Sequence, residues 1–178
     1  MGVSEVISVR VALPSDAERL GHIKVTSWRA AYAGLLPDQV LADLSIPYLV
    51  DEFRKRLRDK ASSTTALVAT IEEAGTGLVC GYAMVGPYRW DELTGAGEVY
   101  AIYVDPSHWG MGAGRALLSA AEQCLLDRGF AAAALWVLEA NLPGRVFYEA
   151  MGWSTDGQRG ERCEVENAPE IRYRKNLF

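Results

Sequence analysis

The feature that most constrains this chain is a glycine-rich turn between an apolar strand and an amphipathic helix. The strand ends at Val104, a turn follows at Asp105, and the segment Gly110-Met111-Gly112-Ala113-Gly114 opens the helix. Unpaired main-chain N–H groups and the positive end of the helix dipole lie together at this point. Such an arrangement can bind a phosphate group without any side chain. Glycine suits such a site because it has no Cβ and tolerates positive φ. The sequence predicts a phosphate-bearing ligand, with a tight turn that merely starts a helix as the alternative.

Two common phosphate-binding motifs do not match this loop. A P-loop carries Lys and then Ser or Thr after its last glycine, where this chain has Arg115-Ala116. A dinucleotide-binding fingerprint needs a further glycine at the position of Arg115. It also needs an acidic residue about 20 positions later, where this chain is rich in alanine. The loop therefore requires a different explanation.

The loop resembles the pyrophosphate-binding loop of the GNAT superfamily of N-acetyltransferases, whose pattern is Arg/Gln-x-x-Gly-x-Gly/Ala after the fourth strand. Gly112 and Gly114 stand at the two glycine positions, and Trp109 departs from the pattern at the Arg/Gln position. Arg115 places a cation in the first helical turn, which a phosphate would explain; a solvated surface charge is the alternative. The resemblance implies that the coenzyme's pyrophosphate is bound by the amides of Gly110, Met111, Gly112, Ala113, Gly114 and Arg115.

A second motif follows one helix and one strand later. A buried strand leads to Asn141, a good N-cap, and Pro143 lies in the first turn of a short helix that Gly152 ends. In GNAT enzymes the matching segment carries an Asn that hydrogen-bonds the pantetheine arm. It also carries a Phe-Tyr pair whose Tyr lies near the thioester sulfur. The resemblance therefore implies coenzyme contacts for Asn141, Phe147 and Tyr148.

The two motifs extend the resemblance over about residues 64–155. It implies an α/β (α+β) chain with the GNAT acyl-CoA N-acyltransferase fold: a mixed sheet of six to seven strands flanked by helices. The fourth and fifth strands should be parallel, because a strand–helix–strand unit crosses over right-handed, and the resemblance implies that they splay apart. Periodicity and turn signals predict strands over 7–11, 65–72, 77–85, 98–104, 131–138 and 170–174, and helices over 15–32, 37–43, 47–60, 112–129 and 142–152.

The splayed strands suggest how the coenzyme is held. In the GNAT fold they leave a V-shaped cleft, in which the unpaired backbone of Ile102, Tyr103 and Val104 would bind the pantetheine amides as an added strand does. The acyl thioester would then reach toward Tyr148. The resemblance thus implies acetyl-CoA as the co-substrate, and the sequence shows no metal-ligand spacing among its cysteines and histidines.

Direct attack of an amine on a thioester requires loss of the ammonium proton, stabilisation of the oxyanion and protonation of the leaving thiolate. Glu98 is the predicted general base, because it begins the strand along the cleft and apolar neighbours would disfavour its charged form. The alternative is a carboxylate paired with a cation. Tyr148 is the predicted acid, with a half-buried helix tyrosine beside Phe147 as the alternative.

The acceptor site is less clear from the sequence. Trp28 and Tyr32 lie one helical turn apart, with Arg29 between them, and would wall an acceptor pocket or belong to the core. Trp90 and Asp91, in the loop before the fourth strand, would face a cationic amine or remain a solvated loop. The same choice applies to three carboxylates of the tail, Glu161, Glu164 and Glu166.

Bulk properties are those of a small globular enzyme. The net charge of −5 argues against non-specific nucleic-acid binding, and no apolar run is long enough to span a membrane. The start of the chain lacks the features of a signal peptide, so a cytoplasmic location is expected. Residues 1–178 are expected to form a single GNAT N-acetyltransferase domain. The sequence does not set its oligomeric state, although GNAT domains often form homodimers.

The sequence therefore favours an enzyme that transfers an acetyl group from acetyl-CoA to a primary amine in a ternary complex. A non-catalytic acyl-CoA sensor or binding module of the same fold is the first alternative, and a nucleotide-binding α/β protein is the second. The acceptor remains open among polyamines, aminoglycoside-like compounds, amino acids and protein N-termini.

Overall fold

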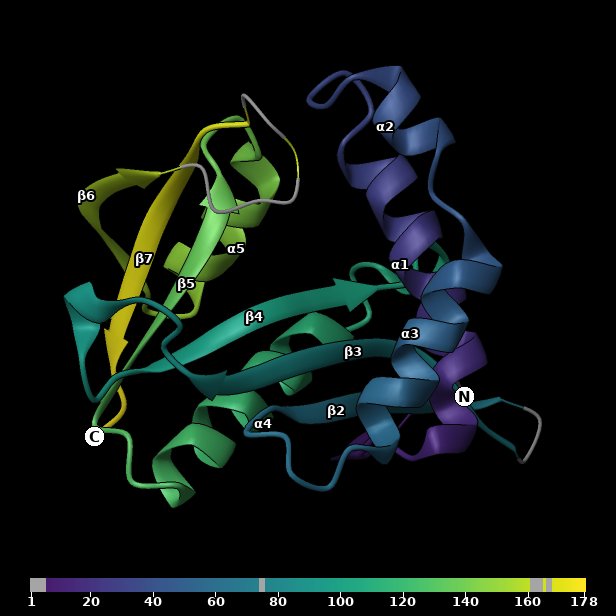
Figure 1. Cartoon of the computed structure of the whole chain (residues 1–178), viewed down its shortest axis with the longest axis horizontal. Coiled ribbons are helices and arrows are strands. Elements are labelled where there is room, and N and C mark those ends of the chain that lie inside the picture. The colour runs from purple at the N-terminus through teal and green to yellow at the C-terminus, as the bar shows by residue number, and fades with distance from the viewer. Residues whose placement is uncertain (1–5, 74–75, 161–164, 166–167) are drawn as a thin grey trace, which may run out of the picture.

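The structure is a computed structural model that describes the chain except for residues 1–5, 74–75, 161–164 and 166–167 (Figure 1). Its elements follow the predicted order. They are β1 (Ile7–Val11), η1 (Pro14–Asp16), α1 (Ala17–Ala31), α2 (Asp38–Ala42), α3 (Ile46–Arg58), β2 (Thr65–Glu73), β3 (Thr76–Pro87), η2 (Asp91–Leu93), β4 (Gly97–Val104), η3 (Pro106–His108), α4 (Ala113–Asp127), β5 (Ala132–Leu138), α5 (Leu142–Ala150), β6 (Ser154–Gly160) and β7 (Glu170–Asn176).

Seven strands form one mixed sheet in the order β1-β2-β3-β4-β5-β7-β6. Its neighbouring strands are antiparallel except for β4 and β5, which are parallel and connected through α4. This confirms the predicted mixed sheet with parallel fourth and fifth strands. The tail, for which the sequence predicts at least one strand, supplies both β7 and the edge strand β6.

Helices cover both faces of the sheet (Figure 1). The helix α4 packs on one face through apolar side chains at helical spacing, and α5 adds partly buried aromatic residues to the same cluster. The four predicted α4 positions, Leu117, Leu118, Ala121 and Leu125, are all fully buried. The helices α1 and α3 cover the opposite face, where a second apolar cluster forms against β2, β3 and β4.

Candidate functional site

The ends of β4 and β5 diverge, and the glycine loop and α5 follow these two ends in the chain (Figure 1). β4 pairs with β5 through three residues, Gly97–Val99. Both strands continue beyond these pairs, β4 to Val104 and β5 to Leu138. The two parallel strands therefore splay at their C-terminal ends, as predicted. The region between β4 after Val99 and β5 after Leu135 is called the splay below.

β4 contains a β-bulge at Tyr100, next to the point where the strands begin to separate. Its neighbours Val99 and Ala101 lie opposite consecutive residues of β3, Val85 and Met84, so Tyr100 is the extra residue. Because of the bulge, Tyr100 and Ala101 both pack on the α1–α3 side of the sheet, whereas Val99 packs on the α4 side. The bulge thus directs the Tyr100 ring to the face opposite α4.

Alternate residues of β4 turn their peptide groups toward β3 and toward the splay. The Asp105 N–H donates to a carbonyl of β3, and a Cβ built on Gly81 would lie 2.9 Å from the Tyr103 carbonyl oxygen. The peptide groups of Tyr103 therefore face β3, and those of Ile102 and Val104 face the splay. This corrects the expectation that all three residues have unpaired backbone, because the Tyr103 main chain belongs to the antiparallel ladder.

Trp109 already uses one of the groups that face the splay. Its indole Nε1 donates a 2.8 Å hydrogen bond to the Val104 carbonyl oxygen, although 49% of the residue is exposed. The exposed Met111 follows in the same loop. Within the described strands, the N–H and C=O of Ile102 and the N–H of Val104 are left for a bound ligand. The tryptophan at the Arg/Gln position thus ties the glycine loop to the end of β4.

The glycine loop has the backbone geometry of an anion site. Gly110 and Gly112 have positive φ angles of 78° and 95°, and Gly112 is the N-cap of α4. The first N–H groups of a helix have no acceptor within the helix, and the dipole adds positive potential at the same end. Ala113 is buried, whereas Arg115 is exposed, with its Nη1 atom 3.4 Å from the Met151 sulfur. The main-chain part of the predicted cradle is therefore present, and the arginine side chain extends toward the end of α5.

Two interactions fix the turn between β4 and α4. Arg19 of α1 forms a 2.7 Å ion pair with Asp105 and also donates to the Val79 carbonyl oxygen. Asp105 in turn accepts hydrogen bonds from the main-chain N–H and the hydroxyl of Ser107. Burial pushes the pKa of Asp105 upward, but the bonds from Ser107 and Arg19 outweigh it and hold the pKa below its usual value. The turn is therefore held by a carboxylate that is stabilised in its charged form.

The helix α5 brings the second motif to the start of α4. A Cβ built on Gly114 would lie 3.5 Å from the Phe147 ring, so this ring covers the first turn of α4. Asn141 is the N-cap of α5, and its Oδ1 atom accepts from the Gly144 N–H at 3.1 Å. The Asn141 side-chain oxygen thus serves the helix, and its Nδ2 is the group that can donate to a ligand.

Tyr148 is half-buried on α5, with ring centroids 5.3 Å from Phe147 and 6.3 Å from Tyr173. Burial raises the pKa of its phenol well above the usual value, and the neighbouring Tyr32 hydroxyl of α1 raises it further. The phenol is therefore protonated at neutral pH and is a hydrogen-bond donor.

The α1 helix presents aromatic side chains to the end of β4. Trp28 is 4% exposed. The centre of its ring lies 5.2 Å from that of Tyr32, in an edge-on arrangement, and 6.4 Å from that of Tyr103. The Lys24 ammonium lies 4.2 Å from the centre of the Trp28 ring. Burial raises the pKa of the Tyr103 phenol, which the polar atoms of Trp28 and Tyr32 partly oppose. Trp28 thus belongs to the core, whereas Tyr32 is only half-buried.

Glu98 is buried and paired. Its side chain is 1% exposed, and its Oε1 atom accepts from the Arg89 Nη2 atom at 2.7 Å. Its Oε2 atom accepts from the Arg89 main-chain N–H at 3.1 Å and from Nε at 3.2 Å. The predicted burial is therefore present, but so is the cation that the sequence left as the alternative, and this cation is Arg89.

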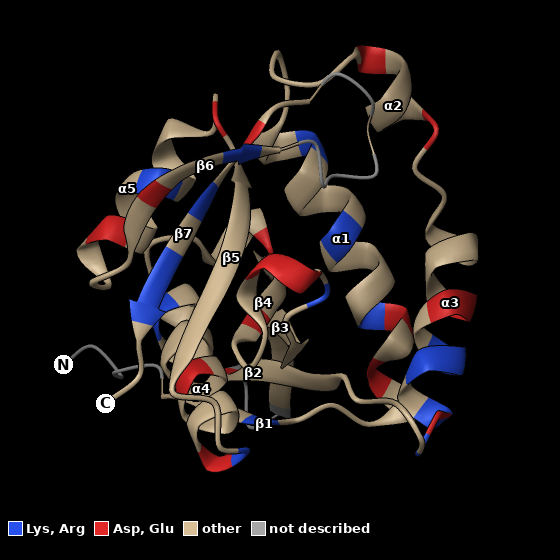
Figure 2. Cartoon of the chain, turned by 60° about the vertical axis from the view of Figure 1, so that its left-hand side comes forward, with Lys and Arg blue, Asp and Glu red and all other residues tan. Residues whose placement is uncertain are grey.

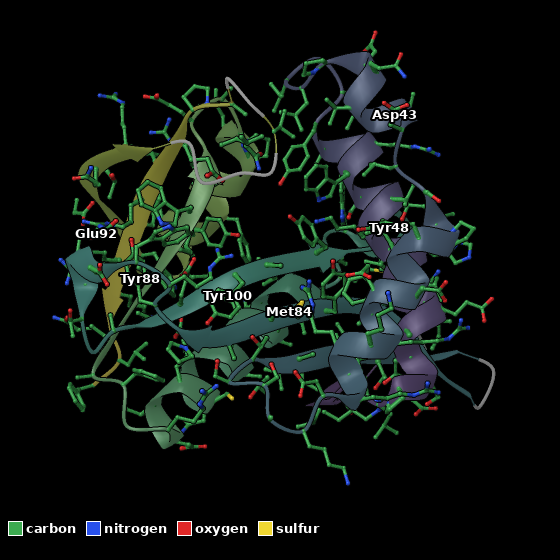
Figure 3. The ribbon with its side chains drawn as sticks, in the orientation of Figure 1. Asp43, Tyr48, Met84, Tyr88, Glu92 and Tyr100 are labelled. Carbon is green, nitrogen blue, oxygen red and sulfur yellow. The ribbon has the colours of Figure 1, made fainter. Side chains whose placement is uncertain are left out.

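The loop between β3 and β4 holds Arg89 over the base of the splay. The guanidinium lies 4.7 Å from the Trp90 ring centre and 4.5 Å from that of Tyr100. Figure 3 shows Tyr100 on β4 and Tyr88 in this loop, close to Glu92. Tyr88 donates to Glu92 at 3.2 Å. The loop therefore forms one aromatic and charged surface with the strand.

A family model described as the acetyltransferase (GNAT) family matches residues 28–153, a range that includes the glycine loop, Glu98 and Tyr148. The chain belongs to the GNAT family. A Bacillus subtilis (strain 168) protein named uncharacterized N-acetyltransferase YuaI is 34% identical over 145 residues, which cover 82% of this chain and 79% of that protein.

Solved GNAT structures share the fold. PaiA N-acetyltransferase from Thermoplasma acidophilum, in complex with coenzyme A, has a TM-score of 0.71 at 19% identity and covers 96% of this chain and 99% of its own. YncA from Salmonella typhimurium, with acetyl-CoA, has a TM-score of 0.68 at 20% identity, and the match covers 97% of this chain and 95% of the YncA chain. At these identities the similarity supports the fold alone.

The remaining predicted acceptor residues of this GNAT chain do not all meet at the splay. Arg29 donates to the carbonyl oxygens of Leu41 and Leu44, so its side chain connects α1 to the segment after α2. Trp90 lies 6.3 Å from the Trp136 ring of β5, whereas Asp91 is exposed in η2. The tail carboxylates Glu161, Glu164 and Glu166 lie outside the described residues.

Three contributors were missed by sequence reasoning: Arg89, Lys24 and Arg19. A cation next to an aromatic pair in the loop before the fourth strand was a signal for Arg89, whereas Arg19 and Lys24 reach the site only through packing of α1. In the part of the chain that the structure describes, no helix is both long and apolar enough to cross a bilayer. Among the same residues, no three His, Cys, Asp or Glu side chains are grouped as metal ligands.

Proposed function

We propose that this chain, acting as one GNAT domain over residues 1–178, transfers an acetyl group from acetyl-CoA to a primary amine by direct attack in a ternary complex. The observation that carries the proposal is the geometry of the splay. β4 stops pairing with β5 after Val99, the glycine loop begins beyond β4, and Tyr148 follows β5 on α5. A strand-like arm in the splay would thus have an anion cradle at one end and a phenol at the other. The two solved relatives with coenzyme A and acetyl-CoA support this assignment of the ligand.

The chain's residues would divide the coenzyme between them. The amides of Gly110–Arg115 would bind the pyrophosphate, and Ile102, the Val104 N–H and the Asn141 Nδ2 atom would bind the pantetheine amides. Phe147 packs over the start of α4, next to the loop that would bind the pyrophosphate.

The chemistry requires three proton transfers. Glu98 would accept the first ammonium proton, directly or through a water, so that the amine attacks the thioester carbonyl carbon. The C–N bond forms, the C–S bond breaks, and the leaving thiolate takes a proton from the Tyr148 phenol. The attacking nitrogen then gives its second proton, which the amide cannot keep, to the Tyr148 phenolate and restores the phenol. Burial of Tyr148 favours this role because it keeps the phenol protonated until a stronger base forms beside it.

The test is release of free thiol from acetyl-CoA over a library of primary amines, with Tyr148→Phe as the diagnostic variant. We expect the variant to lower kcat by about 100-fold, as for loss of a general acid, while the Kd for acetyl-CoA stays within twofold. Tyr48→Phe is the matched control, because Tyr48 is 64% exposed on α3 (Figure 3). This variant should keep the wild-type kcat. Coenzyme binding without thiol release for any amine would instead indicate a non-catalytic acyl-CoA-binding protein.

A further inference from the structure

The pairing of Glu98 with Arg89 raises a problem for the proposed base. The carboxylate is 1% exposed and three hydrogen bonds from Arg89 engage both of its oxygens. A carboxylate covered in this way cannot accept a proton from an acceptor amine. For Glu98 to act, the Arg89 guanidinium has to leave, whereas the bond from the Arg89 main-chain N–H can remain.

Arg89 is the exposed member of this group, and its aromatic neighbours are held by other contacts. The Arg89 side chain is 49% exposed. By contrast, the Tyr100 hydroxyl donates to the Pro87 carbonyl oxygen, and the Tyr100 ring lies directly over Gly86. Trp90 is held by ring contacts with Tyr88 at 5.5 Å and with β5 at 6.3 Å. Rotation of Arg89 alone would therefore leave a preformed site of one carboxylate and two aromatic faces.

We propose that this site, formed by Glu98, Trp90 and Tyr100, binds the ammonium group of the acceptor, and that Arg89 occupies it until the acceptor arrives. The inference rests on the proposed function and names its acceptor as a cationic primary amine. A buried carboxylate without a partner is strongly unfavourable, so replacement of one cation by another is the low-cost way to uncover Glu98. Aromatic faces favour an alkylammonium as they favour a guanidinium.

The exchange also gives a balanced proton path. The acceptor enters as R–NH3⁺, transfers one proton to the Glu98 carboxylate and attacks as R–NH2. The amide, coenzyme A thiol and one proton are the products, and the proton leaves from Glu98 to solvent. The Arg89 guanidinium then returns and restores the charged pair, which prepares the next cycle.

Several groups surround Glu98. Its register partners are Gly86 on β3 and Ala134 on β5, neither of which ionises. On β4 itself the neighbour is Tyr100, whose pKa is raised by burial and then by the Glu98 charge.

Figure 2 shows basic residues along β7. Of these, Arg174 lies across from Ala134 and contacts Asp156 at 3.9 Å. The buried Arg172 contacts Tyr88 at 3.2 Å and Glu92 at 3.8 Å, both in the loop that carries Arg89. In the part of the chain that the structure describes, Glu98 forms its ion pair with Arg89.

The test is Arg89→Ala, measured through the pH dependence of kcat/KM for an amine found in the thiol-release screen. Because the variant removes the cation beside a buried carboxylate, the acidic limb of this profile, where kcat/KM rises with pH, should move upward by about one pH unit or more. Above that limb, the KM for the amine should fall several-fold because no internal cation competes. Arg89→Lys should keep the limb near its wild-type position.

The matched control is Arg10→Ala. Arg10 also forms a two-point pair with a carboxylate, Asp16, but β1 and η1 lie away from the splay. Loss of the Arg10–Asp16 pair should lower the melting temperature and leave the acidic limb of the kcat/KM profile at its wild-type pH. An unmoved limb in Arg89→Ala would overturn the proposal. So would a KM that rises for amines bearing a carboxylate, because Arg89 would then bind the acceptor's anion.

A second measurement does not depend on turnover. Methylguanidinium chloride should raise the melting temperature of Arg89→Ala, relative to the same ionic strength of sodium chloride, and should leave the wild type unchanged. The double variant Arg89→Ala/Glu98→Gln should lose the response. No stabilisation of Arg89→Ala would contradict the cation site even where acetyl transfer is present. Stabilisation without thiol release would support the site and contradict the proposed function.

Discussion

The two sides of the splay are built in different ways. On the coenzyme side, the candidate groups are main-chain N–H and C=O groups of β4, the glycine loop and the first turn of α4. On the acceptor side, they are side chains: Glu98, Arg89, Trp90 and Tyr100, with the α1 aromatic residues beyond them. A main-chain site requires a local conformation, whereas a side-chain site requires separate segments to meet. One side would therefore suit a ligand of fixed chemistry, and the other could change its side chains without a change of fold.

The strongest test of this comparison is Gly112→Ala. The residue has a φ of 95°, which is strained for alanine by about 1–3 kcal/mol, and relaxation would turn the loop amides away from the phosphate. We expect the Kd for coenzyme A, measured by calorimetry, to rise at least about tenfold.

Gly95→Ala is its control on the acceptor side. Gly95 has a φ of 82°, and a Cβ there meets no atom within 4 Å. The backbone strain should be similar and coenzyme affinity unchanged. Equal losses of affinity in both variants would mean that general destabilisation, rather than the cradle, explains the result.

A smaller effect is expected from Asp105→Asn, which tests whether the coenzyme side depends on a charged side chain as well. The folded pKa of Asp105 lies below the unfolded value of about 4, so its contribution to stability is complete above that value and disappears as the pH falls through the folded pKa. Urea unfolding should show a loss of about 1–3 kcal/mol at pH 7, and the stabilities of the two proteins should converge as the pH falls through the folded pKa. A difference that persists undiminished in acid would rule out this explanation.

The smallest effect is expected from Trp109→Phe, because one neutral hydrogen bond contributes about 1 kcal/mol. Loss of the bond to Val104 should make the loop less ordered before binding, so the Kd for coenzyme A should rise by about threefold to tenfold. Trp153→Phe removes a comparable indole bond, to Glu122, and should leave coenzyme affinity unchanged. Tighter binding by Trp109→Phe would mean that the indole competes with the pantetheine arm for the Val104 carbonyl oxygen.

The contrast between main-chain and side-chain sites also explains how much of the fold and of the candidate site could be predicted from the sequence. Strand and helix positions, the parallel pair and the glycine loop follow from patterns within single segments. Which peptide groups of β4 face the splay depends on the register with β3, so the expectation of unpaired backbone at Tyr103 was wrong. The Arg89–Glu98 pair spans nine positions and a loop, and the contact between the Trp28 and Tyr103 rings depends on how α1 packs. Spacing along the chain contains no such information.

The three residue pairs that join β4 to β5 have a consequence for the whole sheet. They are the main-chain seam between the antiparallel half β1–β4 and the half formed by β5, β7 and β6. An extended arm lying in the splay would lengthen that seam on the β4 side, so the bound substrate would act as part of the framework that holds the halves together.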